Sequence, residues 1–332
     1  MQYLLIILGS LIYLGVVCDI LKTTLSMQGS GWLTSKFSHF FWNVMLVLSG
    51  RDGKSKFLAK AGFYLLIKII LIWVGLLVVS FFLLLLADSD AIVNSAKIPG
   101  SVLDKLYYAG FILSTLGIGD FTPSNNIWRI ITDIYAFTGL ILITMSVTYF
   151  IPVLSAVIKQ RKLGINLSSL GSSVEKIILN AWNGSDYTFF KLQLLNFSDA
   201  LLEHNQNHRA YPVIHFFHNN DKEHSIVLQV ARLNEAIFVI ERFLKPEYSI
   251  PEQELSSIRT ALDNYIKVIE EVSNIKVSED PPKWDSLELL AEKGMLKENW
   301  NSILLNKDKE HNRAMFLTLI ERDGWKWNDV TM

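Results

Sequence analysis

The stretch that decides the fold is residues 101–123, SVLDKLYYAGFILSTLGIGDFTP, which lies between two long apolar runs. Ser101, followed three residues later by Asp104, is typical of the capping box that begins a helix. A helix over 101–114 is about 20 Å long at 1.5 Å per residue, which is less than the roughly 30 Å of membrane hydrocarbon. The sequence therefore predicts a re-entrant segment, in which a short helix enters the membrane and the chain returns on the same side.

The returning chain is TLGIGD, residues 115–120, in which glycine alternates with bulkier residues. Glycine accepts positive φ at no steric cost, so such an alternation lets successive carbonyls point to one side. Non-helical backbone at membrane depth is tolerated only where protein or a water-filled path surrounds it. A ring of such carbonyls can replace the hydration shell of an ion. The pattern indicates an ion path lined by backbone oxygens.

The flanking apolar runs predict membrane-spanning helices. They lie at 61–87 and 127–158, and a third run at 1–21 begins without Lys or Arg and has no small-residue cleavage pattern, so we expect a retained N-terminal anchor helix. Residues 22–60 are expected to form a cytoplasmic linker. Its segment 33–48, with Trp32 and Trp42 at the interface, is predicted to be an amphipathic interfacial helix, and a fourth membrane crossing is the alternative.

Charge divides the chain into two parts. The 332 residues contain 31 Lys plus Arg and 32 Asp plus Glu, so the net charge is −1, which disfavours a nucleic-acid binder. Residues 1–158 carry a net charge of +3 and no Glu, whereas 159–332 carry −4. Basic residues in 51–60 and 159–162 place these flanks in the cytoplasm. We therefore expect a multi-pass protein of the plasma membrane with a cytoplasmic C-terminal domain over 159–332.

The motif Thr-x-Gly-x-Gly-Asp at 115–120, with Pro123 three residues later, resembles the selectivity filter of the potassium channel family. Runs 61–87 and 127–158 resemble the outer and inner helices of its two-transmembrane pore module, with 101–114 as the pore helix. The resemblance implies an all-α integral membrane homotetramer, because one motif per chain cannot encircle an ion. It also implies that potassium ions are the permeant species and that no other cofactor is needed.

The roles that the resemblance implies fall on individual residues of this motif. The potassium ligands would be the backbone carbonyls of Thr115, Leu116, Gly117 and Ile118, with Gly119 completing the series and Asp120 at the outer mouth.

In the inner helix the resemblance implies a gating hinge at Gly139 and a kink near the gate at Pro152. A small residue for close helix packing is the alternative for Gly139, and the end of the regular helix is the alternative for Pro152. Ile143 and Val147 share the face of Gly139 and are expected to line the pore, the alternative being contact with lipid.

Two positions depart from the family pattern. Ile118 stands where Tyr is usual, and Phe111 stands where some members have a carboxylate. We therefore expect the filter to be held more by packing of Tyr107, Tyr108 and Phe111 than by hydrogen bonds. A weakly selective cation channel is accordingly an alternative to a potassium-selective one.

Residues 159–332 have apolar residues at helical spacing and predict a helical, regulatory domain. His204 and His208 would share a helix face and suggest a metal or proton site, the alternative being a solvated helix end. No nucleophile-base pair or metal-ligand spacing indicates an enzyme. A membrane-tethered sensor or scaffold with a non-conducting pore is the alternative of another class. Besides copies of itself and potassium ions, the expected partners are membrane lipids.

Overall fold

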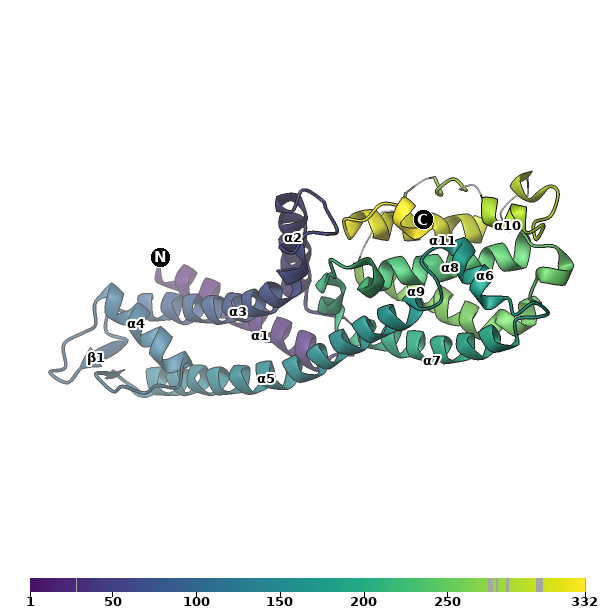
Figure 1. The fold of residues 1–332 in the computed structure, drawn as a ribbon. Helices are drawn as coiled ribbons and strands as arrows, with labels where there is room; N and C mark the ends of the chain where they lie inside the picture. Colours follow the sequence, from purple (N-terminus) through teal and green to yellow (C-terminus); the bar gives the residue numbers. More distant parts are fainter. Residues whose placement is uncertain (28, 274–276, 279, 285–286, 303–306, 332) are drawn as a thin grey trace. The chain divides into compact units, whose positions relative to one another are not determined.

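The computed structural model describes all residues except 28, 274–276, 279, 285–286, 303–306 and 332. The chain forms two compact units: unit 1 comprises residues 1–40 and 63–153, and unit 2 comprises residues 41–62 and 154–332. The chain passes from one unit to the other at residues 40/41, 62/63 and 153/154. Figure 1 shows the elements of each unit, which are described separately below.

Unit 1 is built from long apolar helices. Its elements, some of which continue into unit 2, are α1 (Gln2–Leu25), α2 (Trp32–Leu48), α3 (Ala61–Leu86), β1 (Ile92–Asn94), α4 (Val102–Leu113), β2 (Phe121–Pro123) and α5 (Asn126–Ser168). A short 3-10 turn, η1 (Leu58–Lys60), precedes α3. Three helical stretches among the described residues are long and apolar enough to cross a membrane, namely α1, η1 with α3, and α5.

The inner of these helices is longer than the sequence predicts. α5 runs through the expected end at residue 158 and stops at Ser168, and it contains Pro152 in its interior. The alternative interpretation of Pro152, that the regular helix ends there, therefore does not hold. Proline removes one backbone donor from the helix, but this helix continues for 16 residues beyond it.

A pair of short strands corrects the all-α expectation. β1 pairs antiparallel with β2, with Ile92 opposite Pro123 and Asn94 opposite Phe121. The pairing joins the segment after α3 to the segment that leaves TLGIGD. It thereby fixes the two ends of the loop-and-helix insertion between the long helices.

The N-terminal helix is more than an anchor, because α1 packs against both α3 and α5, and Figure 1 shows the three side by side. Ser80 of α3 donates to the Gly9 carbonyl of α1 at 2.8 Å, and its hydroxyl also lies 2.6 Å from that of Tyr135 in α5. Tyr13 of α1 bonds Thr138 of α5 at 2.8 Å. Such hydrogen bonds, together with small residues, hold helices together where no water drives their association.

A buried carboxylate joins α1 to the start of α2. Asp19 is 1% exposed and accepts hydrogen bonds from the backbone N–H of Leu33 at 2.8 Å, the Thr34 hydroxyl at 2.5 Å and the Trp73 indole of α3 at 3.0 Å. A Cβ on Gly31 would lie 2.0 Å from this carboxylate, so only glycine allows the approach. Asp19 therefore caps the N-terminus of α2 from another helix.

Helix α2 forms as expected over residues 32–48, but Trp42 does not lie at an interface. It is 6% exposed, its ring packs 5.9 Å from Phe216, and its indole donates to the Arg322 carbonyl at 3.1 Å, all within unit 2. Trp32, in contrast, is 60% exposed. α2 is not among the three candidate spans, so the fourth crossing finds no support in the described residues.

Unit 2 is a helical domain, as the sequence predicts. Its α-helices beyond α5 are α6 (Val174–Ala181), α7 (Thr188–Ala210), α8 (Ile226–Arg242), α9 (Ser256–Ser273), α10 (Glu288–Glu292), α11 (Lys307–Arg322) and α12 (Asn328–Thr331). The 3-10 turns are η2 (Pro212–Phe216), η3 (Lys222–His224), η4 (Pro246–Tyr248), η5 (Glu252–Leu255) and η6 (Trp300–Ser302).

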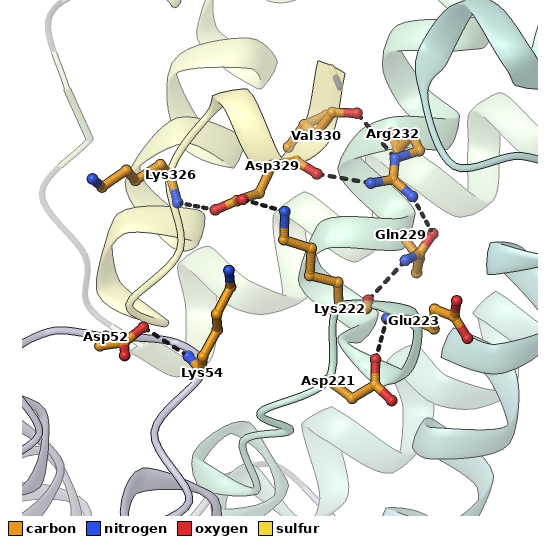
Figure 2. A network of polar contacts seen from close by, with 10 residues as sticks. All are labelled: Asp52, Lys54, Asp221, Lys222, Glu223, Gln229, Arg232, Lys326, Asp329 and Val330. Carbon is orange, nitrogen blue, oxygen red and sulfur yellow. Dashed lines mark hydrogen bonds and ion pairs between the residues drawn. The ribbon is translucent and has the colours of Figure 1, made fainter.

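Helix α8 is the core of unit 2, because every residue from 226 to 240 is buried. Two charged side chains on it are satisfied internally. Arg232 donates to the carbonyls of Val330 at 2.9 Å and Asp329 at 2.7 Å, and Glu235 accepts from Arg313 of α11 at 3.0 Å. Figure 2 shows how Arg232 and the neighbouring Lys222 hold the end of the chain, with Lys222 paired to the Asp329 carboxylate at 2.5 Å.

We predict that Asp19→Ala destabilises the protein by about 3 kcal/mol, because several buried donors, the Trp73 indole among them, then lose their acceptor. Thermal unfolding in detergent should show a lower midpoint than for the wild type. Asp90→Asn, at an exposed acid between α3 and β1, is the matched control. Equal midpoints for the two variants would contradict the capping role.

Candidate functional site

The helix that precedes TLGIGD is anchored at both ends. At its start the Ser101 side chain accepts from the Asp104 N–H and the Asp104 carboxylate accepts from the Ser101 N–H, which is the predicted capping box. Lys105 donates to the Asp88 carbonyl at 2.6 Å, and the Tyr108 hydroxyl bonds Thr132 of α5 at 3.1 Å. α4 is thus held against the segment after α3 and against α5.

The backbone of residues 115–119 alternates in handedness. Thr115, Gly117 and Gly119 have φ values of +59°, +58° and +82°. Thr115 is one of three non-glycine residues with positive φ among the described residues, and a side chain there is strained. Every second residue therefore adopts the conformation that the glycine pattern predicts, which turns consecutive carbonyls toward a common side.

The aromatic residues of α4 contribute both packing and hydrogen bonds. Phe111 lies 5.1 Å from the ring of Tyr107 and 5.0 Å from that of Tyr108. The Tyr107 hydroxyl lies close enough to the Asp120 carboxylate for the two groups to interact electrostatically. Asp120 further accepts from the N–H of Phe121 at 3.0 Å. Beside these ring contacts, α4 has one side-chain hydrogen bond to α5, from Tyr108 to Thr132, and the expectation that packing holds the filter more than hydrogen bonds do stays a prediction.

Gly139 of α5 lies directly on the end of α4. A Cβ at this position would stand 2.1 Å from the Leu113 carbonyl oxygen, so no other residue permits this approach without displacing backbone. The structure thus supports close helix packing, which was one of the two roles considered for Gly139. Its role as a gating hinge stays a prediction.

Ile143 and Val147 lie with Gly139 along one apolar cavity of about 410 Å³. Leu113 and Ser114, at the base of TLGIGD, line the same cavity. The structure thus brings the predicted pore-lining face of α5 together with the start of the loop. Pro152, by contrast, does not line this cavity and lies two residues beyond Phe150, the last residue of α5 that does.

A second cavity, of about 360 Å³, lies on the other side of the loop. Its lining includes Gly117 and Gly119 together with Arg129 and Asp133 from the first turns of α5. No pattern in the sequence connects these two charged residues with TLGIGD. Their only signal was their position near the start of an otherwise apolar run.

The two histidines singled out in the sequence are buried, not solvated. His204 and His208 are 5% and 3% exposed, with ring centroids 5.7 Å apart. Burial and a neighbouring histidine lower the pKa of His204 to about 4 and that of His208 to about 3. Both imidazoles are therefore neutral near pH 7. In the part of the chain that the structure describes, no group of three or more His, Cys, Asp or Glu is arranged to hold a metal ion.

Comparison with known proteins identifies the module. A family model described as an ion channel matches residues 69–156, from within α3 to within α5. The chain is also 31% identical over 326 residues, 97% of its length, to the uncharacterized membrane protein YdjJ of Bacillus subtilis strain 168, of which it covers 94%. Residues 69–156 therefore belong to the ion channel family, and the whole chain belongs to the same family as this membrane protein. No solved structure matches this channel.

We predict that Gly139→Ala costs the channel about 1–3 kcal/mol, because the new methyl group must push α5 away from the Leu113 carbonyl. The lower thermal midpoint should be accompanied by a loss of ion flux, since the displaced carbonyl adjoins the loop. Gly75→Ala in α3 is the control, because a Cβ there meets nothing within 4 Å. A variant at residue 139 that is as stable and active as this control would contradict the packing role.

Proposed function

We propose that this channel is a homotetramer that passes potassium ions selectively and passively through a filter made of residues 115–120. The observation that carries the proposal is the alternating backbone of TLGIGD, with positive φ at residues 115, 117 and 119, directly after the capped helix α4. Carbonyl oxygens stacked in this way are the ligands that replace a cation's hydration shell. The proposed ligands are the carbonyls of Thr115 to Ile118.

The end of α4 favours a cation at the inner end of this filter. Helix α4 stops at Leu113, and the loop begins two residues later at Thr115. The last carbonyls of a helix carry partial negative charge, which attracts cations. The apolar cavity lined by Leu113, Ile143 and Val147 lies at the same end, so in the assembled channel it would adjoin the ion path. Asp120 would lie at the opposite, outer end.

Four copies are needed because each chain supplies one loop. α5 also carries an exposed apolar seam that a second copy would cover. Its 43 residues extend about 64 Å, about twice the hydrocarbon thickness. Leu154, Ile158 and Ile165, in the part of the helix beyond Pro152, are 46%, 69% and 42% exposed at spacings of four and seven residues. Apolar residues at this spacing are typical of helices that associate with one another.

Ile118 favours a second candidate, a cation channel of weak selectivity. Its side chain is 51% exposed and has no hydroxyl with which to brace the filter to α4. The hydrogen bond between Tyr108 and Thr132 braces α4 against α5, the Tyr107 hydroxyl lies near Asp120 at the outer end, and the contacts of Phe111 supply packing. We favour potassium selectivity because these contacts hold α4 and the end of the loop together.

The proposed orientation of the chain in the membrane follows from the positions of its Lys and Arg residues. The basic residues of 51–60 and 159–162 would face the cytoplasm of a plasma membrane, with unit 2 as a cytoplasmic, regulatory domain. Residues 88–123 would then face the exterior, so that Asp120 marks the outer entrance.

Flux through liposomes tests the function. We expect wild-type protein to pass potassium and thallium, with a reversal potential that follows the potassium gradient when sodium replaces potassium on one side. Gly117→Ala should abolish flux, because φ is +58° there and a side chain would distort the carbonyl series. Gly75→Ala in α3 is the matched control, since it adds the same methyl group at a position where a Cβ meets nothing within 4 Å.

Each outcome of this experiment decides between the candidates. Flux of both potassium and sodium with a reversal potential near zero would favour the weakly selective channel. No flux from an intact tetramer, under any condition, would favour a tethered sensor or scaffold. Unchanged flux in Gly117→Ala would exclude residues 115–120 as the filter.

The tetramer is tested separately. We expect native mass spectrometry to give a mass of four chains of 37.8 kDa each. Ile158→Asp should convert tetramers into smaller species, because four buried carboxylates along the seam would repel one another. Asn166→Asp, which adds the same single charge at an exposed position of the same helix, is the control. Tetramers of equal stability in both variants would show that the seam does not join the subunits.

A further inference from the structure

Within unit 2, the segment that links α2 to α3 is fixed to the end of α11 and the turn that follows it. The Gly53 N–H donates to the Gly324 carbonyl at 2.8 Å. A Cβ on Gly53 would lie 2.5 Å from the ring of Trp325, so the two segments meet backbone against side chain. Trp42, at the end of α2, donates to the Arg322 carbonyl at 3.1 Å. The linker is therefore held by a few specific contacts.

His218 lies at the centre of these contacts. Its side chain is fully buried, with Nδ1 2.9 Å from an Asp323 carboxylate oxygen and Nε2 2.6 Å from the Gly53 carbonyl oxygen. Its ring lies 6.2 Å from that of Trp42 and 5.8 Å from that of Trp325. Both nitrogen partners accept hydrogen bonds and do not donate them. A neutral imidazole has one N–H, so both bonds form only when the ring is the doubly protonated imidazolium.

The electrostatic surroundings support the charged form. Burial by itself would lower the pKa of His218, but the Asp323 charge and hydrogen bond, the Gly53 carbonyl and the Asp52 charge together raise it above its ordinary value. Besides Asp323, the titratable groups that share the small cavity beside His218 are His204, His208 and His215 of α7 and η2 and Tyr265 of α9, whose pKa burial raises so that it stays neutral. The first two stay neutral near pH 7, because burial holds their pKa values far below it.

We propose that His218, Asp323 and Gly53 form a pH-sensitive latch that holds the 49–57 linker to the helical domain when His218 is protonated and releases it when His218 loses its proton. Protonation of the folded state is favoured over that of the open state, so the latch is fully stabilised below the ordinary titration range of histidine. Its stabilisation is lost as the pH rises through the elevated pKa of the folded state. The latch therefore weakens on alkalinisation.

The linker continues through η1 into α3 without another turn of irregular chain, because η1 ends at Lys60 and α3 begins at Ala61. Release of Gly53 therefore removes a restraint eight residues before the start of the outer helix at Ala61. An effect of this release on ion flux rests on the proposed channel function, whereas the latch itself does not rest on it. The latch and the channel function together predict that ion flux responds to the pH on the side of the membrane that carries unit 2.

Hydrogen exchange of the full-length tetramer in liposomes tests the latch directly. After correction for the intrinsic pH dependence of exchange, the protection of peptides covering 49–57 and 320–326 should fall between about pH 6 and about pH 8.5. The expected fall is about tenfold for each unit by which the pKa of His218 is raised. Peptides from α8 serve as the internal control, because that helix is buried throughout and does not take part in the latch.

Two variants make the test specific. His218→Gln cannot titrate, so the protection of residues 49–57 should be low and independent of pH. Asp323→Asn keeps the imidazole but removes its counter-charge, so the midpoint should move to lower pH by about one unit or more. Unchanged protection of α8 shows that each variant is folded. A wild type without a pH-dependent change, or a His218→Gln variant with the wild-type midpoint, would overturn the proposal.

Flux measured in the same liposomes separates the latch from the channel function. We expect the ratio of fluxes at about pH 6 and about pH 8.5 on the unit 2 side to differ from one in the wild type and to approach one in His218→Gln. An identical pH dependence in both proteins would exclude the latch from gating. A pH-dependent change in exchange with no flux at any pH would leave the latch standing and reject the proposed function.

Discussion

The contact between Gly139 and the Leu113 carbonyl is the constraint on which the arrangement of unit 1 depends. The final carbonyls of a helix have no partner within the helix, and their position determines where the following chain starts. Here α5 lies so close to that carbonyl that a Cβ would be 2.1 Å away. The loop of residues 115–120 therefore begins at a point that the inner helix fixes, and any movement of α5 at this level moves the start of the loop.

The same unit is joined elsewhere by hydrogen bonds between buried polar groups of different helices. Ser80 bonds both the Gly9 carbonyl and the Tyr135 hydroxyl, so one side chain of α3 connects α1 and α5. Asp19 gathers donors from α2 and α3. Because lipid tails are as apolar as the helix surfaces, burial alone does not choose which helices meet, and these hydrogen bonds supply the choice. The N-terminal helix is thus part of the framework around the candidate filter.

Local sequence patterns predicted the parts of the structure that depend on neighbouring residues. The Ser101–Asp104 capping box, the handedness of residues 115–119 and the helical nature of unit 2 all follow from spacings of a few residues. The parts that were missed depend on distant partners. Asp19 receives bonds from residues 14 and 54 positions away, and the pairing of Ile92 with Pro123 joins segments on either side of α4. Hydrophobic periodicity carries no information about such pairs.

The burial of His204 and His208 in unit 2 also depends on distant partners, and local sequence patterns did not predict it. This burial determines which histidine can respond to pH. Their surroundings in the sequence are polar, and only the packing of α7 against α9 and η2 removes them from water. Because burial without a counter-charge disfavours the imidazolium, these two residues are unsuited to titrate near neutral pH. His218 is equally buried, but it faces a carboxylate and a carbonyl. Burial makes the charge of His218 depend on these two partners, and one of them belongs to the linker that leads into the outer helix. A change of protonation at this single ring therefore cannot occur without a change in how that linker is held.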